Sequence, residues 1–520
     1  MRPMNTKLHI TATRAFPLVM TVLFLALANT SRAAAPGIKG TSFNLTAQAS
    51  FISQPDGAMI YSWGYGCADT SSVTFVPAMP NNNCPRMQVP GPTLIVTENT
   101  QFTVTLANGL PAAAGNTSIL FPGLQLISTS GGAPGLLTQE ATATSPVTYT
   151  LKALSPGTRA YYSGTRGDLQ IEMGLYGAVI VLPASPPSCP ARNFNAETVT
   201  ETDYRLSTAA YDHPATCYDR EYLFQFSEID PHIHRQALAQ AGNTCPAGVT
   251  SGCMNVTTEP YRPTYYMING RSMPDDMDTN YAAEYPHQPY NGNPHMHPGE
   301  QVLLRIVGTG RWQHPFHEHG NHVRILGRDG NLILSQTDAT KLAGPLLFTT
   351  TTTPGLAMDG IFYWTGRGLN WDVFGHDANH DPGCTPDANG YYTAASGAPL
   401  TAPNYYEWCQ DHLKALEKAP FGDVAAGGPA TLPDSNILTN GAWYAGSPYL
   451  GPDATIRAVG TTGTTPPSGK NVNPPTTEAG FAFMWHSHNE REITTNDVFP
   501  GGMMMMMLVD PRAFVIDESN

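Results

Sequence analysis

The chain has 520 residues, of which only 13% are charged, about half the usual share for a globular protein. The net charge of −14 argues against a nucleic-acid partner, because phosphate binding requires a basic surface. The length is sufficient for two or three domains, and 49 glycines with 46 prolines predict many turns and loops. Short apolar runs between these turn residues indicate a mainly β protein.

The first 35 residues have the pattern of a secretory signal peptide. Arg2, Lys7 and Arg14 precede the apolar run FPLVMTVLFLALA, and the small residues SRAAA follow it. Cleavage is expected between about Ala33 and Ala35, and an uncleaved membrane anchor is the alternative. No other stretch is long and apolar enough to cross a bilayer. We therefore expect an exported protein, periplasmic or secreted, with no membrane span after cleavage.

The mature chain begins with alternating apolar and polar residues between turn signals. GPTLIVTENTQFTVTLANGLP, PVTYTLKAL and GLYGAVIVLP predict antiparallel strands of a β-sandwich. ASPPSCPARN at 184–193 has the composition of a linker. A second block of predicted strands starts near Glu197 and includes EYLFQFSEI, YYMING and EQVLLRIVG.

Residues 366–475 interrupt this alternation. They are rich in Pro, Gly, Asn and Asp, and they contain one short helical pattern, YYEWCQDHLKALEKA. A structureless connection of this length is unusual in a compact domain, so the segment is interpreted as an insertion held by a disulfide or as part of a third domain. The closing strands are AGFAFMWHSH and GGMMMMMLVDP.

Eight cysteines fit an oxidising compartment. Pairing them in sequence order gives four short loops, which is the entropically easiest of many connectivities. None lies in a CxxC pair or beside a histidine pair, which argues against a thiolate metal site. The cysteines are Cys67, Cys84, Cys189, Cys217, Cys245, Cys253, Cys384 and Cys409.

Two histidine motifs lie on predicted strands and could bind a metal. HPFHEHG contains three histidines and WHSH contains two: His314, His317, His319, His486 and His488. Residues two apart on a strand project from the same face, and imidazole suits copper, zinc, iron and nickel. For any single histidine an ordinary buried or surface role is more common, but two spaced pairs favour a metal site. The pairs His295/His297 and His232/His234 have the same spacing and are less favoured.

The chain resembles the multicopper oxidase family over most of its mature length. The resemblance is carried by VPGPTLIVTENTQFTVTLANGLP, SPGTRAYYSG, YMINGRSMP, HPFHEHGNHVRILGRDG and WHSH, in this order. It implies an all-β fold of tandem cupredoxin-like Greek-key β-barrels or sandwiches, two here or, in the commoner arrangement, three. The expected divisions are a signal peptide (1–35), an N-terminal domain (36–185), a linker (186–196) and a C-terminal region (197–515) that includes the loop-rich insertion at about 366–475.

The resemblance also implies roles for the histidine motifs. His314 would face a mononuclear copper, and four histidines would face a copper cluster. Ser487 and Glu492 stand where the family has a cysteine and a later histidine, and Met503 could match the axial ligand. The cluster positions are His317, His319, His486 and His488.

The first domain lacks the corresponding ligands. Leu120 and Pro122 stand where the family has its first histidine pair, and Tyr162 and Gly164 stand at the second. A serine hydroxyl is hard and stays protonated at neutral pH, so it cannot replace the soft thiolate of a blue copper centre. We therefore do not expect an intact type 1 centre, an intact trinuclear cluster or oxygen reduction by the usual family route.

A smaller site could remain in the C-terminal region. Its histidines would bind copper, or zinc if the geometry is tetrahedral, and Glu318, Glu490 or Glu492 could add an oxygen ligand. The methionine run Met503–Met507 could offer thioethers to Cu(I), but packing of alternate methionines in the core is favoured. No catalytic residue and no organic cofactor is identified.

The resulting hypothesis is an exported copper-binding protein, with oxidation of a small-molecule or metal-ion reductant as one activity. The alternative is a non-catalytic cupredoxin scaffold or a metal-storage protein of the cell envelope. The spacing of the motifs favours two domains and, by resemblance, a homotrimer. A neighbouring subunit, or Tyr161, Tyr162 or Asp168, could then supply missing ligands.

Overall fold

The computed structural model describes residues 35–69, 74–76, 84–190, 201–249, 252–367, 384–399, 402, 405–410, 446–449, 480–512 and 514–517. The predicted signal peptide, except for Ala35, and most of the predicted insertion at 366–475 lie outside these ranges. Within them, no helix is long and apolar enough to cross a membrane.

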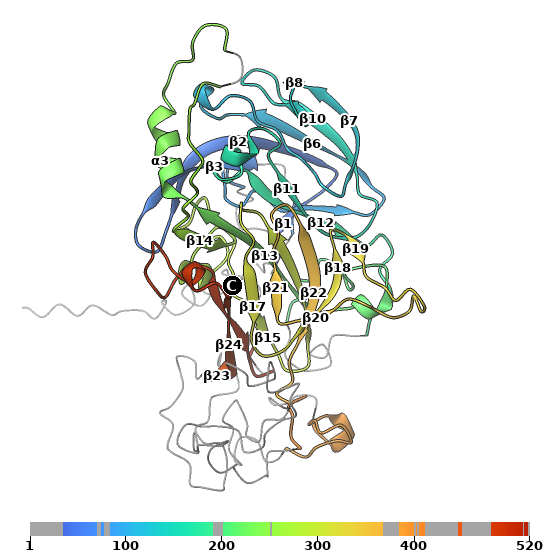
Figure 1. The fold of residues 1–520 in the computed structure, drawn as a ribbon. Coiled ribbons are helices and arrows are strands. Elements are labelled where there is room, and N and C mark those ends of the chain that lie inside the picture. The colour runs from blue at the N-terminus through green and yellow to red at the C-terminus, as the bar shows by residue number, and fades with distance from the viewer. Residues whose placement is uncertain are drawn as a thin grey trace, which may run out of the picture.

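Two five-stranded sheets pack face to face to form a first sandwich (Figure 1). One sheet has the order β11-β12-β5-β1-β4: Gly157–Tyr162, Tyr176–Leu182, Leu94–Thr97, Gly37–Lys39 and Phe75–Val76. The other has the order β3-β2-β6-β10-β7: Met59–Cys67, Ser42–Ser53, Gln101–Asn108, Val147–Lys152 and Gln125–Gly131. A small ribbon of β8 and β9 lies beside them: Ala133–Pro134 and Gln139–Glu140.

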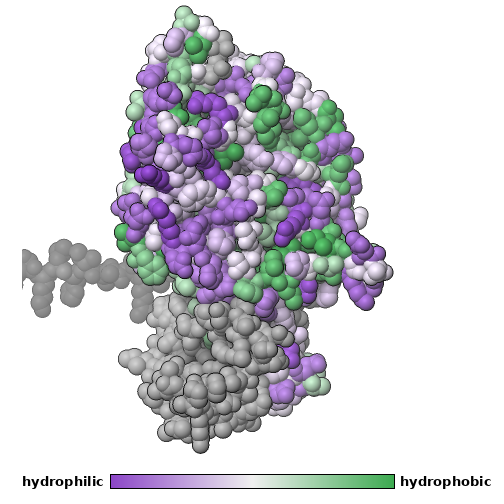
Figure 2. All heavy atoms as spheres, viewed as in Figure 1, coloured by the Kyte–Doolittle hydropathy of each residue, from purple (hydrophilic) through white to green (hydrophobic). Residues whose placement is uncertain are grey.

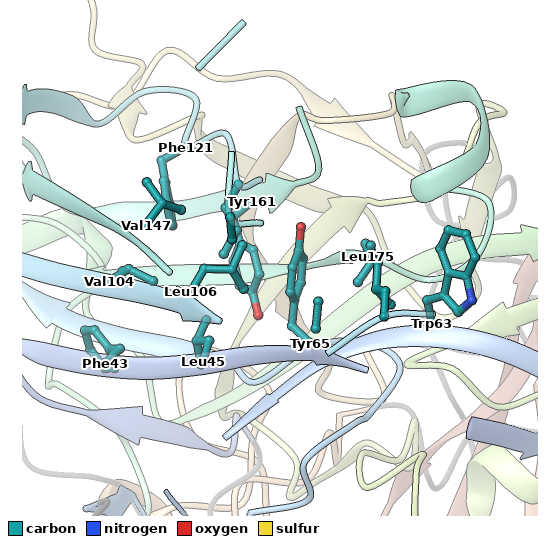
Figure 3. Packing of buried hydrophobic residues seen from close by; sticks show 14 of the residues in the cluster. Phe43, Leu45, Trp63, Tyr65, Val104, Leu106, Phe121, Val147, Tyr161 and Leu175 are labelled. Atoms are coloured by element: carbon teal, nitrogen blue, oxygen red, sulfur yellow. The ribbon is translucent and has the colours of Figure 1, made fainter. Parts of the chain in front are cut away.

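The apolar alternation of the sequence produces the core of this sandwich. Exposed or half-buried residues alternate with buried residues along β6 and β10. Figure 3 shows the inward side chains of several strands packed together, with Phe43 and Leu45 of β2 near Val104 and Leu106 of β6. Each side chain of this size stabilises the fold by about 1.5–3 kcal/mol when it leaves water.

Parallel strand pairs define the topology. β2 pairs with β6, and β5 pairs with both β1 and β12, in parallel. Parallel neighbours cannot be joined by a tight turn, so the chain crosses between the two sheets. This is the Greek-key arrangement, and it confirms the predicted all-β cupredoxin-like fold.

A second sandwich follows in the chain. One sheet has the order β14-β13-β16-β22-β18-β19, and β20 also pairs with β18: Tyr265–Ile268, Arg220–Ile229, Gln301–Gly308, Ala357–Tyr363, Val323–Arg328, Asn331–Leu332 and Leu346–Leu347. The facing sheet has the order β15-β25-β24-β17-β21, and β23 also pairs with β24: His295–Met296, Met504–Val509, Gly480–Ser487, Pro315–Glu318, Thr349–Thr351 and Gly446–Tyr449. The domain boundaries given above stay predictions.

Helices are few and short. Among the described residues, the α-helices are α2 and α3, Gly167–Gln170 and Pro231–Gln240. The 3-10 helices are Ala112–Ala114, Pro214–Thr216, Asp275–Met277, Ala394–Ser396 and Glu490–Ile493. In α3 the Asp230 side chain accepts a hydrogen bond from the backbone N–H of His232, and Pro231 occupies the first turn, which is a favourable helix start.

The four disulfides join the cysteines in sequence order, as predicted. They are Cys67–Cys84, Cys189–Cys217, Cys245–Cys253 and Cys384–Cys409.

A buried polar network joins the two sandwiches. Asp359 of β22 accepts hydrogen bonds from the hydroxyl and the backbone N–H of Thr158 in β11, at 2.6 and 3.0 Å. It also accepts one from the hydroxyl of Tyr211 at 2.7 Å. Arg305 of β16 donates to Thr158 at 3.1 Å and to Glu221 at 2.8 Å. All five side chains are buried, so this hydrogen-bonded network lies in the interior between the two sandwiches.

Candidate metal centre

Strands β17 and β24 bring the two histidine motifs together. They are antiparallel neighbours in one sheet (Figure 1), and His317 lies directly opposite His486. Phe316 and Trp485 point into the core of the second sandwich. Because side chains alternate along a strand, His317 and His486 point to the other face.

Four imidazole rings gather on that outer face. The distances between ring centroids are 4.7 Å for His317–His319, 5.6 Å for His317–His486, 5.0 Å for His317–His488, 5.1 Å for His319–His486 and 5.9 Å for His486–His488. His317 and His319 are buried, His486 is half-buried and His488 is exposed. The predicted cluster positions therefore form one group, which we call the four-histidine face, at the surface of this chain.

One pair already has the spacing of metal ligands. Nε2 of His486 lies 3.3 Å from Nε2 of His319. Two nitrogens bound to one tetrahedral ion at about 2.0–2.1 Å would be about 3.3 Å apart. Within the described part of the chain, however, no three His, Cys, Asp or Glu side chains are yet arranged to hold a metal ion. Binding at the four-histidine face therefore requires the other two rings to turn.

The second ring nitrogens have partners that orient the imidazoles. Nδ1 of His486 lies 2.7 Å from the backbone carbonyl of Ser487. A carbonyl only accepts, so Nδ1 carries the hydrogen and Nε2 presents a lone pair, as a metal ligand requires. Nδ1 of His317 lies 2.9 Å from the Thr349 hydroxyl. Both histidines are oriented by groups next to the face.

Burial favours the neutral form of His317 and His486. Burial lowers the pKa of His317, and the neighbouring histidines lower that pKa further, to about 4. Burial also lowers the pKa of His486. Neutral imidazole is the form that binds a metal.

His314 lies apart from this face. Its Nε2 is 2.9 Å from a carboxylate oxygen of Glu228, and its Nδ1 is 2.9 Å from a carboxylate oxygen of Glu492. All three side chains are buried. Burial alone lowers the pKa of His314, but hydrogen bonds and the charges of both glutamates outweigh it and raise this pKa to about 9. The ring is an imidazolium with both nitrogens engaged.

Further donors fix the two carboxylates. The Ser487 hydroxyl donates to Glu492 at 2.5 Å, and the side-chain amide of Asn489 donates to its other oxygen at 2.9 Å. Glu228 accepts from two backbone N–H groups, those of Arg311 and Trp312, at 2.7 and 2.9 Å. The hydroxyl of Tyr261 donates to the same oxygen at 3.0 Å.

These residues do not fit a mononuclear blue copper site. The serine hydroxyl and the glutamates are hard ligands, and a protonated His314 has no lone pair to offer. Met503 is fully buried in the core cluster, and its carbonyl accepts from the backbone N–H of Ser487 at 2.9 Å. A buried ion network of Glu228, His314, Glu492 and Ser487 occupies this region.

The candidate oxygen ligands are not on the four-histidine face. Glu318 lies between two of the histidines in sequence but points to the buried side, where it accepts from the Thr350 hydroxyl. Burial raises the pKa of Glu318 to about 8, so it is protonated at neutral pH. Glu490 is exposed, and Glu492 is engaged with His314.

The first sandwich has apolar residues at the positions where the resemblance predicts further ligands. Leu120 and Tyr162 lie opposite each other in a β-bridge, with backbone hydrogen bonds of 2.7 and 3.2 Å. Leu120 and Pro122 line an apolar cavity of about 280 Å³ that also contacts Tyr149 and Leu137. Figure 2 shows apolar side chains gathered over this part of the surface, near β7 and β10. This surface offers no imidazole to a metal.

The side chains that could have replaced the missing metal ligands of the first sandwich make contacts within the protein instead. Tyr161 is buried and its hydroxyl donates to the carbonyl of Pro92 at 2.7 Å. Asp168 accepts from the Thr258 hydroxyl at 3.0 Å on the surface. Tyr162 is half-buried and packs beside Gly355 of the second sandwich.

The less favoured histidine pairs make protein contacts. His232 and His234 lie on helix α3 rather than on a strand, and residues two apart on a helix do not face each other. His234 is buried, with Nδ1 2.6 Å from the carbonyl of Tyr61. His295 contacts the Asp510 carboxylate at 2.7 Å, and His297 contacts Glu201 at 2.9 Å.

Sequence reasoning did not identify Glu228 as the partner of His314. The signal available was an ionisable residue inside the otherwise apolar strand pattern EYLFQFSEI, because a buried carboxylate needs a partner. Nothing in the pattern pointed to a histidine 86 residues away in the chain.

Comparison with known proteins agrees with the resemblance. Residues 84–186 and residues 257–355 each match a family model described as multicopper oxidase. No curated protein sequence matches significantly.

Similar solved structures include the blue copper oxidase from Nitrosomonas europaea, at 16% identity and a TM-score of 0.43, covering 90% of this chain and 85% of that one. Multicopper oxidase mgLAC is 16% identical with a TM-score of 0.44, and the match covers 90% of this chain and 86% of that one. The copper nitrite reductase from Nitrosomonas europaea is 16% identical with a TM-score of 0.38, and the match covers 63% of this chain and 85% of that one. The two family models, matched in chain order on the two sandwiches, support a cupredoxin-domain protein of the multicopper oxidase family.

Proposed function

We propose that this chain is an exported copper-binding protein that holds copper at the four-histidine face. The observation that carries the proposal is the convergence of four imidazoles, with two Nε2 atoms 3.3 Å apart. Copper and zinc both accept imidazole ligands, and family membership favours copper. A bound copper ion would supply one-electron redox chemistry at this face.

The proposal includes neither a type 1 centre nor a complete trinuclear cluster. Ser487 and the glutamates around His314 argue against a type 1 centre, because no thiolate is present to conduct electrons. The apolar residues Leu120 and Pro122 argue against a complete trinuclear cluster. Oxidation of a phenol or a metal ion at the remaining copper would therefore proceed without the electron-entry site of the family.

Export and assembly belong to the same proposal. Four disulfides support an oxidising compartment outside the cytoplasm. The exposure of His488 leaves the four-histidine face open, so a neighbouring copy in a homotrimer could cover it. Sedimentation of the purified mature chain measures this association.

Copper loading tests the proposal. The mature chain is stripped with a chelator, incubated with Cu(II) or Zn(II), desalted and measured by elemental analysis and electron paramagnetic resonance. We expect bound copper at stoichiometric level. His317→Ala and His486→Ala should each lower the affinity by at least the roughly 10- to 100-fold that loss of an outer-shell partner costs. His322→Ala is the matched control, because His322 packs on Phe348 beside the face without joining the four rings. Copper-free wild-type protein after loading would overturn the proposal.

The second candidate is a scaffold that binds no metal. The observation that favours it is that no three His, Cys, Asp or Glu side chains of the described residues are arranged to hold an ion. The loading experiment decides between the two, and an oxygen-consumption assay with a phenolic substrate then measures turnover of the loaded protein.

A further inference from the structure

The final methionine run presents alternate residues to opposite faces of its sheet. β24 and β25 are antiparallel, with Trp485 opposite Met505 and His486 opposite Met504. Residues directly opposite in such a pair lie on the same face. Met505 therefore shares the core side with Trp485, and Met504 shares the outer side with His486.

Burial agrees with this division. Three methionines of the run have no exposed surface and belong to the core of the second sandwich: Met503, Met505 and Met507. Met504 and Met506 are not in that core cluster; Met504 is buried at 4% exposed, and Met506 is half-buried. The prediction that alternate methionines pack inward is therefore confirmed by Met503, Met505 and Met507.

A third outer methionine comes from the neighbouring strand. Met484 lies directly opposite Met506, is half-buried and precedes His486 by two residues. The outer face thus contains one row of His317, His486 and Met504, and a second row of Met484 and Met506. Opposite residues have Cβ atoms about 4.5–5.5 Å apart, which a methionine side chain spans easily.

This combination of ligands suits a particular oxidation state. Thioethers are soft ligands that select Cu(I), whereas imidazole binds Cu(I), Cu(II) and zinc. An apolar face of the same size could be built from leucine, which offers no ligand atom. Three thioethers beside four imidazoles therefore add a preference that the imidazoles alone do not have.

We propose that Met484, Met504 and Met506 extend the four-histidine face into a binding site for monovalent copper. The inference rests on the proposed copper-binding function and deepens it by naming the ion as Cu(I). The three thioethers bind the reduced ion next to the imidazoles, and they contribute little to Cu(II) or zinc binding. Met503, Met505 and Met507 serve only as core.

The test compares outer with inner methionines. The outer variant is Met484→Leu with Met504→Leu and Met506→Leu, and the matched control replaces the three inner methionines by leucine. Leucine conserves volume, so both variants are expected to fold. Binding is measured with Ag(I), a redox-inert monovalent probe, by calorimetry, and with Cu(I) by competition against a chromophoric chelator under anaerobic conditions. Cu(II) is titrated in parallel.

We expect the outer variant to lose about 10- to 100-fold in affinity for Ag(I) and Cu(I) and to keep its affinity for Cu(II). The inner variant should keep all three affinities. Equal Ag(I) and Cu(I) affinities in wild type and outer variant, with Cu(II) still bound, would overturn this inference alone. If wild type binds no Cu(II), the proposed function fails instead. Single replacements at Met504 and Met506 provide the same comparison if the triple variant is unstable.

Discussion

The buried ion network around His314 predicts a specific loss of stability at alkaline pH. The two glutamates raise the pKa of this histidine from 6.5 to about 9 in the folded protein. The difference of about 2.5 between these values corresponds to about 3 kcal/mol. Because folding raises the pKa, this stabilisation is present below about pH 6.5 and is lost as the pH rises through about 9.

His314→Gln isolates this contribution, because glutamine does not titrate. Metal-free wild type and variant are unfolded in urea at several pH values between 6 and 10, and the free energies of unfolding are subtracted. We expect the difference to be about 3 kcal/mol larger at pH 6 than above pH 9. Glu490→Gln is the control, since Glu490 is exposed near the network and should leave the profile unchanged.

A difference between wild type and His314→Gln that stays constant from pH 6 to 10 would refute this reasoning. It would mean that the imidazole does not gain a proton on folding. A Glu492→Gln variant checks the cause: removal of one carboxylate should move the loss of stability to lower pH, because one of the two negative charges next to the ring is gone.

Three other outcomes follow from the structure. Ser487→Cys alone should bring no intense blue colour with Cu(II), because both nitrogens of His314 stay bonded to carboxylates; a strong visible charge-transfer band would contradict this. Leu106→Ala should lower the free energy of unfolding by about 2–5 kcal/mol, whereas Leu136→Ala, at 93% exposed, should change it by less than about 0.5 kcal/mol in urea titrations. Removing copper from loaded protein with a chelator should lower the melting temperature. A free copper concentration of about a hundred times the Kd stabilises the folded state by about 2.7 kcal/mol. An unchanged melting temperature would show that copper does not bind the folded state preferentially.

Much of the fold follows from local patterns in the sequence. Strands such as Gln101–Asn108 and Val147–Lys152 alternate apolar and polar residues, so the period of two identifies them. Short loops between successive cysteines made the disulfide pairing predictable. The i, i+2 spacing of His317 and His319 placed both rings on one face, and the register with β24 confirms that the second motif joins them.

Other features depend on long-range pairing and could not be predicted in this way. A run of five identical methionines has no polar–apolar alternation, so its phase on the strand is set only by the register with WHSH. The partner of His314 lies on β13, and no local pattern connects the two. The sequence analysis did not predict helix α3, although Asp230 and Pro231 form a recognisable helix start.

The hydrogen-bonded contact among Thr158, Asp359 and Arg305 has a consequence for cooperativity. Melting of the first sandwich would remove Thr158 from Asp359 and Arg305, and a hydrogen bond to a charged group contributes about 1.5–3 kcal/mol. This cost couples the unfolding of the two sandwiches. A substitution in the core of the first sandwich would then lower the occupancy of the proposed metal site in the second, although no atom of that site has moved.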